Sequence, residues 1–154
     1  MSTPTLPGPE ECNCFAVRSA ARYVTQLYDQ LLAPAGLRST QFSILWKLKR
    51  RGALTINALA DEMVMDRTTL GRNVQPLERD GLIRIETAPS DRRAKELHLT
   101  MTGEKRLQAG LKAWAKAQAR FEAGFGNKRA AELRMLLHAV TASQLTPPAQ
   151  LENR

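Results

Sequence analysis

The 154-residue sequence has few of the side chains that build metal sites and disulfide frameworks. It contains two cysteines and two histidines, and a single residue separates Cys12 from Cys14. That spacing matches neither a zinc ribbon nor a C-x-x-C redox motif, and a structural zinc site would need further ligands. We therefore expect no metal and no other cofactor.

Long apolar stretches and catalytic signatures are also missing. No apolar run approaches the roughly 18 residues that a membrane-spanning helix needs, and residues 1–10 lack the apolar centre and cleavage pattern of a signal peptide. Neither a glycine-rich phosphate loop nor a nucleophile with a matched base is present, and Cys14 has no histidine near it in the sequence. These absences favour a cytoplasmic protein that is not an enzyme and has no membrane partner.

The composition that remains is aliphatic and basic. Aromatic residues make up 5% of the chain and hydrophobic residues 43%, a balance that favours a helical fold with an aliphatic core. Lysine and arginine total 23 against 15 acidic residues, which gives a formal net charge of +8. A basic chain suits a polyanionic partner, although charge alone does not specify a fold or a ligand.

Apolar side chains at three- and four-residue steps predict helices in the first third of the chain. The first helix covers about residues 13–33 and ends at Pro34 and Gly36. We expect Thr40 to cap the second helix, which Gly52 ends.

The stretch 54–102 contains the strongest pattern. Thr55 and Asp66 stand where they would cap two short helices, and the strand-like runs 82–87 and 95–100 follow, with a turn between them. The order of helix, turn, helix and basic-tipped hairpin predicts a winged helix-turn-helix, which presents one helix and one cationic loop to the grooves of DNA.

The flanking segments predict a second unit. A long helix should start at Thr102 and break at Gly126, and a last helix should end at Pro147 and Pro148. Their apolar faces exceed what the central module covers, so we expect a homodimer of interdigitating terminal helices; folding back onto the same subunit is the alternative. The fold is then mainly α with a small β-hairpin wing, divided into an arm (1–11), a helical dimerisation domain (12–36 and 103–146), a winged helix-turn-helix domain (37–102) and a tail (147–154).

The helix that begins after Asp66 carries the side chains that read a major groove. Arginine pairs with guanine, asparagine and glutamine pair with adenine, and threonine offers a hydroxyl together with a methyl group for thymine. The candidate residues are Arg67, Thr68, Thr69, Arg72, Asn73 and Gln75. An ordinary solvated helix face carries the same residue types, but the basic hairpin that follows favours a DNA reader.

The hairpin and two helix starts supply the remaining DNA-binding candidates. Arg92 and Arg93 suit a narrow minor groove, where Asp91 would orient an arginine through a charge-assisted hydrogen bond. Lys95 and Arg84 suit phosphates. A helix N-terminus also attracts phosphate, which adds a last group of candidates: Ser39 and Thr40, next to Gln41, and Thr55.

These segments together resemble the MarR family of winged-helix transcriptional regulators, from Cys14 to Leu145. The matching residues are Leu59-Ala60, Arg67-Thr68-Thr69-Leu70, Leu77-Glu78-Arg79-Asp80-Gly81-Leu82-Ile83, Asp91-Arg92-Arg93-Ala94-Lys95 and Leu97-His98-Leu99-Thr100-Met101-Thr102-Gly103. The resemblance implies a triangular homodimer on a palindromic operator in double-stranded DNA, with repression relieved by a small ligand or an oxidant. It also implies that Arg93 inserts into the groove and that Asp91 steadies it.

The start of the first helix resembles the organic-hydroperoxide-sensing branch of that family, in which tyrosine hydroxyls activate a cysteine. Cys14 and Tyr28 match this branch, but Arg18 and Ser39 stand where it carries tyrosine. Arg18 and the helix N-terminus would favour a thiolate at Cys14. The alternative is a passive, half-buried cysteine.

A small-molecule effector is the other control that we consider. Arg18, Arg22, Tyr23 and Tyr28 could hold an aromatic acid in a cleft between the dimer helices and the winged domain, although surface charge and core packing explain them equally well. The preferred hypothesis is a dimeric, sequence-specific repressor released by an aromatic or phenolic ligand. The alternatives are a thiol-based redox repressor that uses Cys14 and a non-specific architectural DNA-binding protein.

Overall fold

A computed structural model describes residues 8–145, in which helices predominate and three short strands form one antiparallel sheet. The elements in chain order are η1 (Pro9–Glu11), α1 (Asn13–Leu32), η2 (Ala33–Ala35), α2 (Ser39–Arg51), β1 (Leu54–Thr55), α3 (Ile56–Met63), α4 (Arg67–Arg79), β2 (Ile83–Ala88), β3 (Asp91–Leu99), α5 (Met101–Phe125) and α6 (Asn127–Ala142). The mainly α fold with a β-hairpin wing is confirmed.

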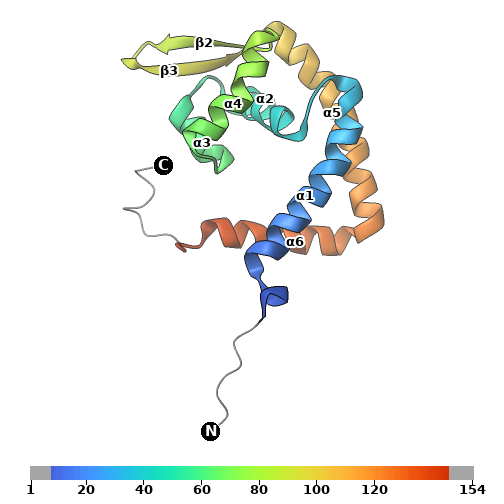
Figure 1. The fold of residues 1–154 in the computed structure, drawn as a ribbon. Helices are drawn as coiled ribbons and strands as arrows, with labels where there is room; N and C mark the ends of the chain where they lie inside the picture. Colours follow the sequence, from blue (N-terminus) through green and yellow to red (C-terminus); the bar gives the residue numbers. More distant parts are fainter. Residues whose placement is uncertain (1–7, 146–154) are drawn as a thin grey trace.

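The elements are arranged as a head and a frame. Helices α2, α3 and α4 form the head, from which the β2–β3 hairpin projects as a wing (Figure 1). The frame consists of α1, α5 and α6. Helix α5 leads away from the base of the wing beside α1, and α6 crosses under α1 at the far end (Figure 1). Within residues 8–145, no helix is long and apolar enough to cross a lipid bilayer.

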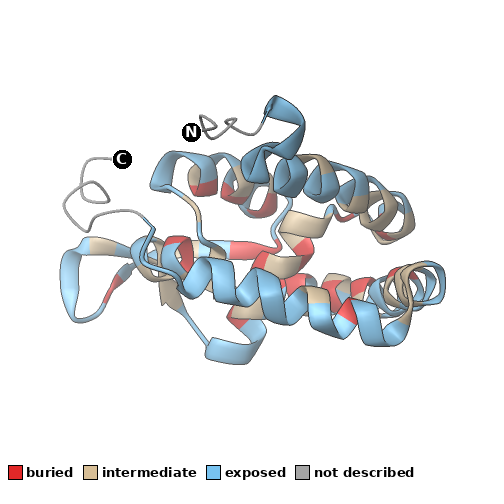
Figure 2. Cartoon of the chain, turned by 90° about the horizontal axis from the view of Figure 1, so that it is seen from below, coloured by how far each residue is buried: buried red, intermediate tan, exposed pale blue. Residues whose placement is uncertain are grey.

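The hydrophobic core lies inside the head. Fully buried leucines come from every layer around it, including Leu45 of α2, Leu59 of α3, Leu70 of α4, Leu97 of β3 and Leu107 of α5. The buried residues gather where these elements face one another, whereas the outer helix faces are exposed (Figure 2). Burial of aliphatic side chains from all of these elements makes the head and the start of α5 one packing unit.

Several helix boundaries follow the predicted caps. The Thr55 hydroxyl accepts the Ala58 amide at 3.1 Å, and the Asp66 carboxylate accepts the Thr69 amide at 2.8 Å, so both predicted N-caps are confirmed. Gly52 ends α2 with a positive φ of 80°.

Three boundary predictions were wrong. Helix α2 starts one residue before Thr40, because the carboxylate of Asp29 accepts the Ser39 amide at 2.7 Å. Helix α5 starts before Thr102, because the Thr100 hydroxyl accepts the Gly103 amide at 3.0 Å. The predicted arm contains the short helix η1, while Pro147 and Pro148 lie outside the described residues.

The wing is longer than the sequence pattern predicted. Strands β2 and β3 pair from Ile83 with Leu99 to Thr87 with Lys95, and after an irregularity Ala88 pairs with Asp91. Residues 91–93 therefore belong to a strand and not to a loop. The alternation of apolar and polar residues fails there because both faces of the strand are exposed. The added strand β1, which pairs with β3, was not predicted.

The start of α5 is anchored to the turn that follows α4. The Thr100 hydroxyl donates to the carbonyl of Gly81 at 2.7 Å, and the Thr100 amide donates to that of Leu82 at 3.1 Å. Gly103 is buried against the same segment, and a Cβ atom at this position would clash with the Leu82 carbonyl oxygen. Only glycine permits this approach of α5 to the head.

We expect Gly103→Ala to lower the free energy of unfolding by about 1–3 kcal/mol, because backbone cannot move aside as a flexible side chain can. The matched control is Gly124→Ala in the same helix, where an added Cβ meets nothing within 4 Å. That change should raise the free energy by about 0.5–1 kcal/mol through helix propensity. Urea unfolding measures both, and an unchanged or higher midpoint for Gly103→Ala would contradict the close approach.

Candidate nucleic-acid interface

Helix α4 buries one side and exposes the other. Leu70, Val74 and Leu77 are at most 3% exposed, at steps of four and three residues that define one face of a helix. Most of the predicted base-reading side chains are exposed, namely Arg67, Thr68, Thr69, Arg72 and Gln75. The helix can therefore be offered to a groove without disturbing the core.

The first turn of α4 is held by a two-point contact. Oδ1 of Asp66 accepts the Thr69 amide and Oδ2 accepts the Thr69 hydroxyl, both at 2.8 Å. The hydrogen bonds from the Thr69 amide and hydroxyl hold the pKa of Asp66 below its usual range, because they favour the carboxylate. Both oxygens of the Asp66 carboxylate are thus held by hydrogen bonds from the first turn of α4.

Asn73 lies at the edge of the exposed face. It is half-buried, and its Nδ2 donates to the carbonyl oxygen of Thr69 at 2.8 Å. One amide hydrogen is therefore used within the helix, and the predicted contact of Asn73 with a base stays a prediction.

Predicted residues from three segments meet in one cleft of about 280 Å³ between the starts of α3 and α4 and the strand β3. The lining residues are Thr55, Ile56, Asn57, Arg67, Asp91, Arg93, Ala94 and Lys95. Three cationic side chains thus border this space, an arrangement that suits phosphate oxygens. Asn57 was not a sequence candidate, since nothing local distinguishes it from other polar helix residues.

The role predicted for Asp91 needs a correction. Its Oδ1 accepts the backbone amide of Arg93 at 2.9 Å, and not a guanidinium group. Asp91 therefore steadies the strand on which Arg93 lies. Arg92 and Arg93 lie in the irregular stretch between the Ala88–Asp91 and Thr87–Lys95 pairs. Lys95 donates to the Thr87 hydroxyl at 3.1 Å.

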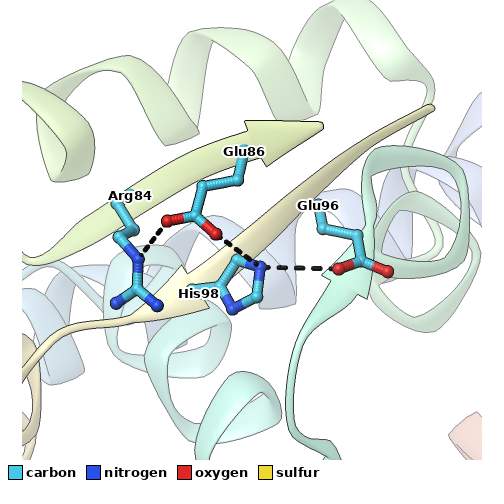
Figure 3. A network of polar contacts seen from close by, with 4 residues as sticks. All are labelled: Arg84, Glu86, Glu96 and His98. Carbon is cyan, nitrogen blue, oxygen red and sulfur yellow. Dashed lines mark hydrogen bonds and ion pairs between the residues drawn. The ribbon is translucent and has the colours of Figure 1, made fainter. Parts of the chain in front are cut away.

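The outer face of the wing carries a charge network of four side chains (Figure 3). Glu86 and Glu96 lie opposite each other on β2 and β3, a like-charge pairing that is unfavourable on its own. Nε of Arg84 contacts Glu86 at 2.6 Å, and Nε2 of His98 lies 3.6 Å from Glu86 and 3.4 Å from Glu96. The hydrogen bond from Arg84 lowers the pKa of Glu86, and His98 adds to this.

This network changes the expectation for Arg84, whose guanidinium already has a carboxylate partner within the wing. Its contact with a phosphate stays a prediction. The same holds for the start of α2, where the Ser39 amide donates to Asp29 and the Arg38 amide donates to Gln41. A phosphate at that position would have to use the side chains of Ser39 and Thr40.

The proposed redox residues do not meet within one chain. Cys14 is exposed in the first turn of α1, so the expectation of a half-buried side chain is wrong here. Tyr28 lies near the other end of the same helix, about 21 Å along its axis at 1.5 Å per residue. The neighbouring Cys12 acts as the N-cap, with its sulfur 3.4 Å from the Phe15 amide.

Of the four residues predicted for a ligand pocket, the structure brings Tyr28 to a cavity. A cavity of about 540 Å³ opens between α1, α5 and α6, and Tyr28 lines it, but Arg18, Arg22 and Tyr23 do not. Tyr23 is instead 77% exposed. All three residues are exposed and lie outside the face of α1 that lines the cavity.

The walls of this cavity are mostly apolar, and a short series of polar side chains connected by hydrogen bonds lies among them. The Tyr28 hydroxyl donates to Oε1 of Gln118 at 2.6 Å, and Nε2 of Gln118 donates to Glu122 at 3.1 Å. Arg134 lies 3.5 Å from Glu122. Burial raises the pKa of Tyr28, the Glu122 carboxylate raises it further, and Arg134 opposes both. Gln118 and Arg134 were missed because only the packing of the three helices brings them to Tyr28.

The three-helix head exposes one face of α4, and a basic wing of two paired strands lies beside it. This arrangement defines the winged helix-turn-helix class of DNA-binding proteins. The MarR family profile matches residues 37–95, which span this head and most of the wing.

Known proteins agree with that class. The M. tuberculosis transcriptional regulator MosR, solved in complex with DNA, is 36% identical, with 88% of this chain and 100% of that chain covered and a TM-score of 0.75. Two Bacillus subtilis proteins are each 27% identical. The helix-turn-helix-type regulator YwoH matches over 92 residues, 60% of this chain and 66% of its own length. The organic hydroperoxide resistance transcriptional regulator matches over 90 residues, 58% and 61%.

The chain thus spans less than two thirds of the length of either Bacillus relative. The match to MosR extends over that whole chain. The protein belongs to the MarR family of transcriptional regulators, as the sequence motifs indicated, and its family consists of DNA-binding regulators and not of enzymes.

Proposed function

We propose that this protein is a dimeric, sequence-specific repressor that binds a palindromic operator in the cytoplasm and is released by a small ligand. The observation that carries the proposal is the convergence of Arg67, Arg93 and Lys95 on one cleft beside the exposed face of α4. Helix α4 would read the major groove while Arg93 enters the adjacent minor groove. Arg67 and Lys95 would grip the phosphates between the two grooves.

Arg72 is the side chain that best tests base reading, because it is exposed on α4 opposite the buried face. We expect Arg72→Ala to remove about 1–3 kcal/mol of discrimination at one base pair of each half-site. Arg120→Ala, which removes the same charge from the exposed side of α5, should leave discrimination unchanged. Affinities for the operator and its single-base variants, measured at fixed salt, give the answer.

A uniform loss of affinity over all sequences would instead support the architectural alternative. Binding of the unaltered protein to its own upstream DNA no tighter than to random duplex would remove the repressor proposal.

A second copy of the chain is the proposed cover for the frame helices. Phe15 on α1 and Leu136 on α6 are each 63% exposed, and Val140 on α6 is 48% exposed. Apolar patches of this kind mark association surfaces. The open cavity between α1, α5 and α6 adjoins them and could receive helices of the second copy. Two-fold symmetry would then match the two halves of a palindromic operator.

We expect Leu136→Glu to weaken the dimer at least about tenfold in Kd, because the change places a charge in each of two symmetry-related apolar contacts. Gln108→Glu, at an exposed position of α5, adds the same charge outside the proposed contact and should leave the dimer intact. Sedimentation velocity across a concentration series measures both. A chain that sediments as a monomer before any substitution would contradict the dimer.

The ligand is proposed to be an aromatic or phenolic acid. Its site would be the cavity between α1, α5 and α6, whose apolar walls suit a ring and whose polar groups come from Tyr28, Gln118 and Arg134. A carboxylate there could compete with Glu122 for Arg134. The second copy would close the open side of the cavity, so that ligand and dimer geometry would be coupled.

The second candidate function is a thiol-based redox repressor. It is favoured by the exposure of Cys14 and by the similarity to the organic hydroperoxide resistance regulator. An organic hydroperoxide would oxidise the thiol to a sulfenic acid and leave as the corresponding alcohol. Because Tyr28 of the same chain is about 21 Å away along α1, a Tyr28 that activates Cys14 would come from the other subunit.

The two candidates predict different outcomes when the DNA complex is titrated with an organic hydroperoxide. The ligand-released repressor keeps its affinity, whereas the redox repressor is released, and Cys14→Ser then abolishes the release. Cys12→Ser is the matched control, because it alters the neighbouring thiol and leaves Cys14 in place. Release that persists in Cys14→Ser would rule out the redox role of this residue.

A further inference from the structure

The first turn of α4 fixes the direction of a hydroxyl hydrogen on the candidate reading face. Thr69 is exposed, and its hydroxyl donates to Oδ2 of Asp66 at 2.8 Å while its amide donates to Oδ1 of the same carboxylate. A threonine hydroxyl has a single hydrogen and two lone pairs. With that hydrogen held by Asp66, Thr69 offers only lone pairs and its methyl group outward.

The bond to Asp66 is strong enough to matter for recognition. A hydrogen bond to an ionised acceptor is roughly twice as strong as one between neutral groups. The second bond, from the Thr69 amide, keeps the carboxylate in place, so it cannot easily turn away. A base acceptor that sought the Thr69 hydrogen would have to break this contact, whereas a base donor would find a free lone pair.

Asn73 also contacts Thr69, one turn later in the helix. Its Nδ2 donates to the carbonyl oxygen of Thr69 at 2.8 Å. A carbonyl oxygen can only accept, so this contact fixes which end of the amide is the nitrogen. Asn73 therefore keeps its Oδ1 and one N–H for other partners, Thr69 offers only acceptors, and Arg72 of the same helix supplies only donors.

We infer that Asp66 sets base specificity by holding Thr69 as a hydrogen-bond acceptor, so that Thr69 favours the amino groups of cytosine or adenine over the oxygens of guanine or thymine. In the major groove, cytosine N4 and adenine N6 are donors, and guanine O6 and thymine O4 are acceptors. Asp66 is thus a positioning residue that acts through Thr69. The inference rests on the proposed reading role of α4.

The test reverses the polarity without removing the helix cap. Asparagine caps helices as well as aspartate does, so Asp66→Asn can still accept the Thr69 amide. Its Nδ2 would then face Oγ1 of Thr69 and donate to it, which frees the Thr69 hydrogen for DNA. Operator duplexes carrying each base pair at every half-site position are compared for the unaltered protein and the variant.

We expect one half-site position to change its preference from cytosine or adenine to guanine or thymine, with about a tenfold change in the ratio of affinities. Thr69→Val identifies that position, because loss of the hydroxyl should flatten the preference there alone. Thr69→Ser keeps the hydroxyl and should preserve the preference.

Loss of a negative charge also raises affinity for every duplex alike. Asp80→Asn removes the same charge at the other end of α4 and should leave all the ratios unchanged. Circular dichroism confirms that each variant retains its helices.

The inference is overturned if Asp66→Asn keeps the original preference, or if Thr69→Val flattens no position. It is also overturned if the position that Thr69→Val flattens prefers guanine or thymine in the unaltered protein. Equal binding of the unaltered protein to all duplexes is a different failure. In that case the reading role of α4 falls, and the role of Asp66 falls with it.

Discussion

The close packing of the start of α5 on the backbone between α4 and β2 is the contact on which the arrangement of the whole chain depends. Gly103 lies against the Leu82 carbonyl, and Thr100 ties its amide and hydroxyl to Leu82 and Gly81. The segment of Gly81 and Leu82 therefore connects the end of α4 to the start of β2, and it also holds the start of α5, the long helix of the frame. The start of α5 is therefore packed and hydrogen-bonded directly to the segment that joins the exposed helix to the wing.

The chain is strongly basic, yet carboxylates lie beside several of its candidate DNA contacts. They are arranged so that their charge is used inside the protein. Asp66 and Asp91 accept backbone amides, and Glu86 pairs with Arg84. An acid directed at a backbone amide shapes a turn. The helix start and the wing thereby gain fixed conformations.

Features that depend on neighbouring residues were predicted well from the sequence. The caps Thr55 and Asp66 and the inward face of α4 follow from short-range patterns, since a capping side chain reaches only a few residues ahead. Features set by distant contacts were missed. Asp29 moves the start of α2, β1 joins the sheet only through β3, and the cavity needs three helices to meet. Five of the eight residues that line the cleft between α3, α4 and β3 were predicted, but Asp91 bonds a backbone amide where a guanidinium partner was expected.

The wing reaches its tip through paired strands and not through a free loop. Arg93 lies in the irregular part of β3 between Asp91, which pairs with Ala88, and Lys95, which pairs with Thr87, and the ladder continues from there through Leu97 into the core. Fixing one residue of flexible chain costs about 1–2 kcal/mol of conformational entropy. If Arg93 were carried by a mobile loop, binding would cost that amount of free energy for each loop residue that becomes ordered. Because strand pairs hold the chain on both sides of Arg93, part of this cost is met before binding, and more of the attraction between Arg93 and a groove would appear as affinity.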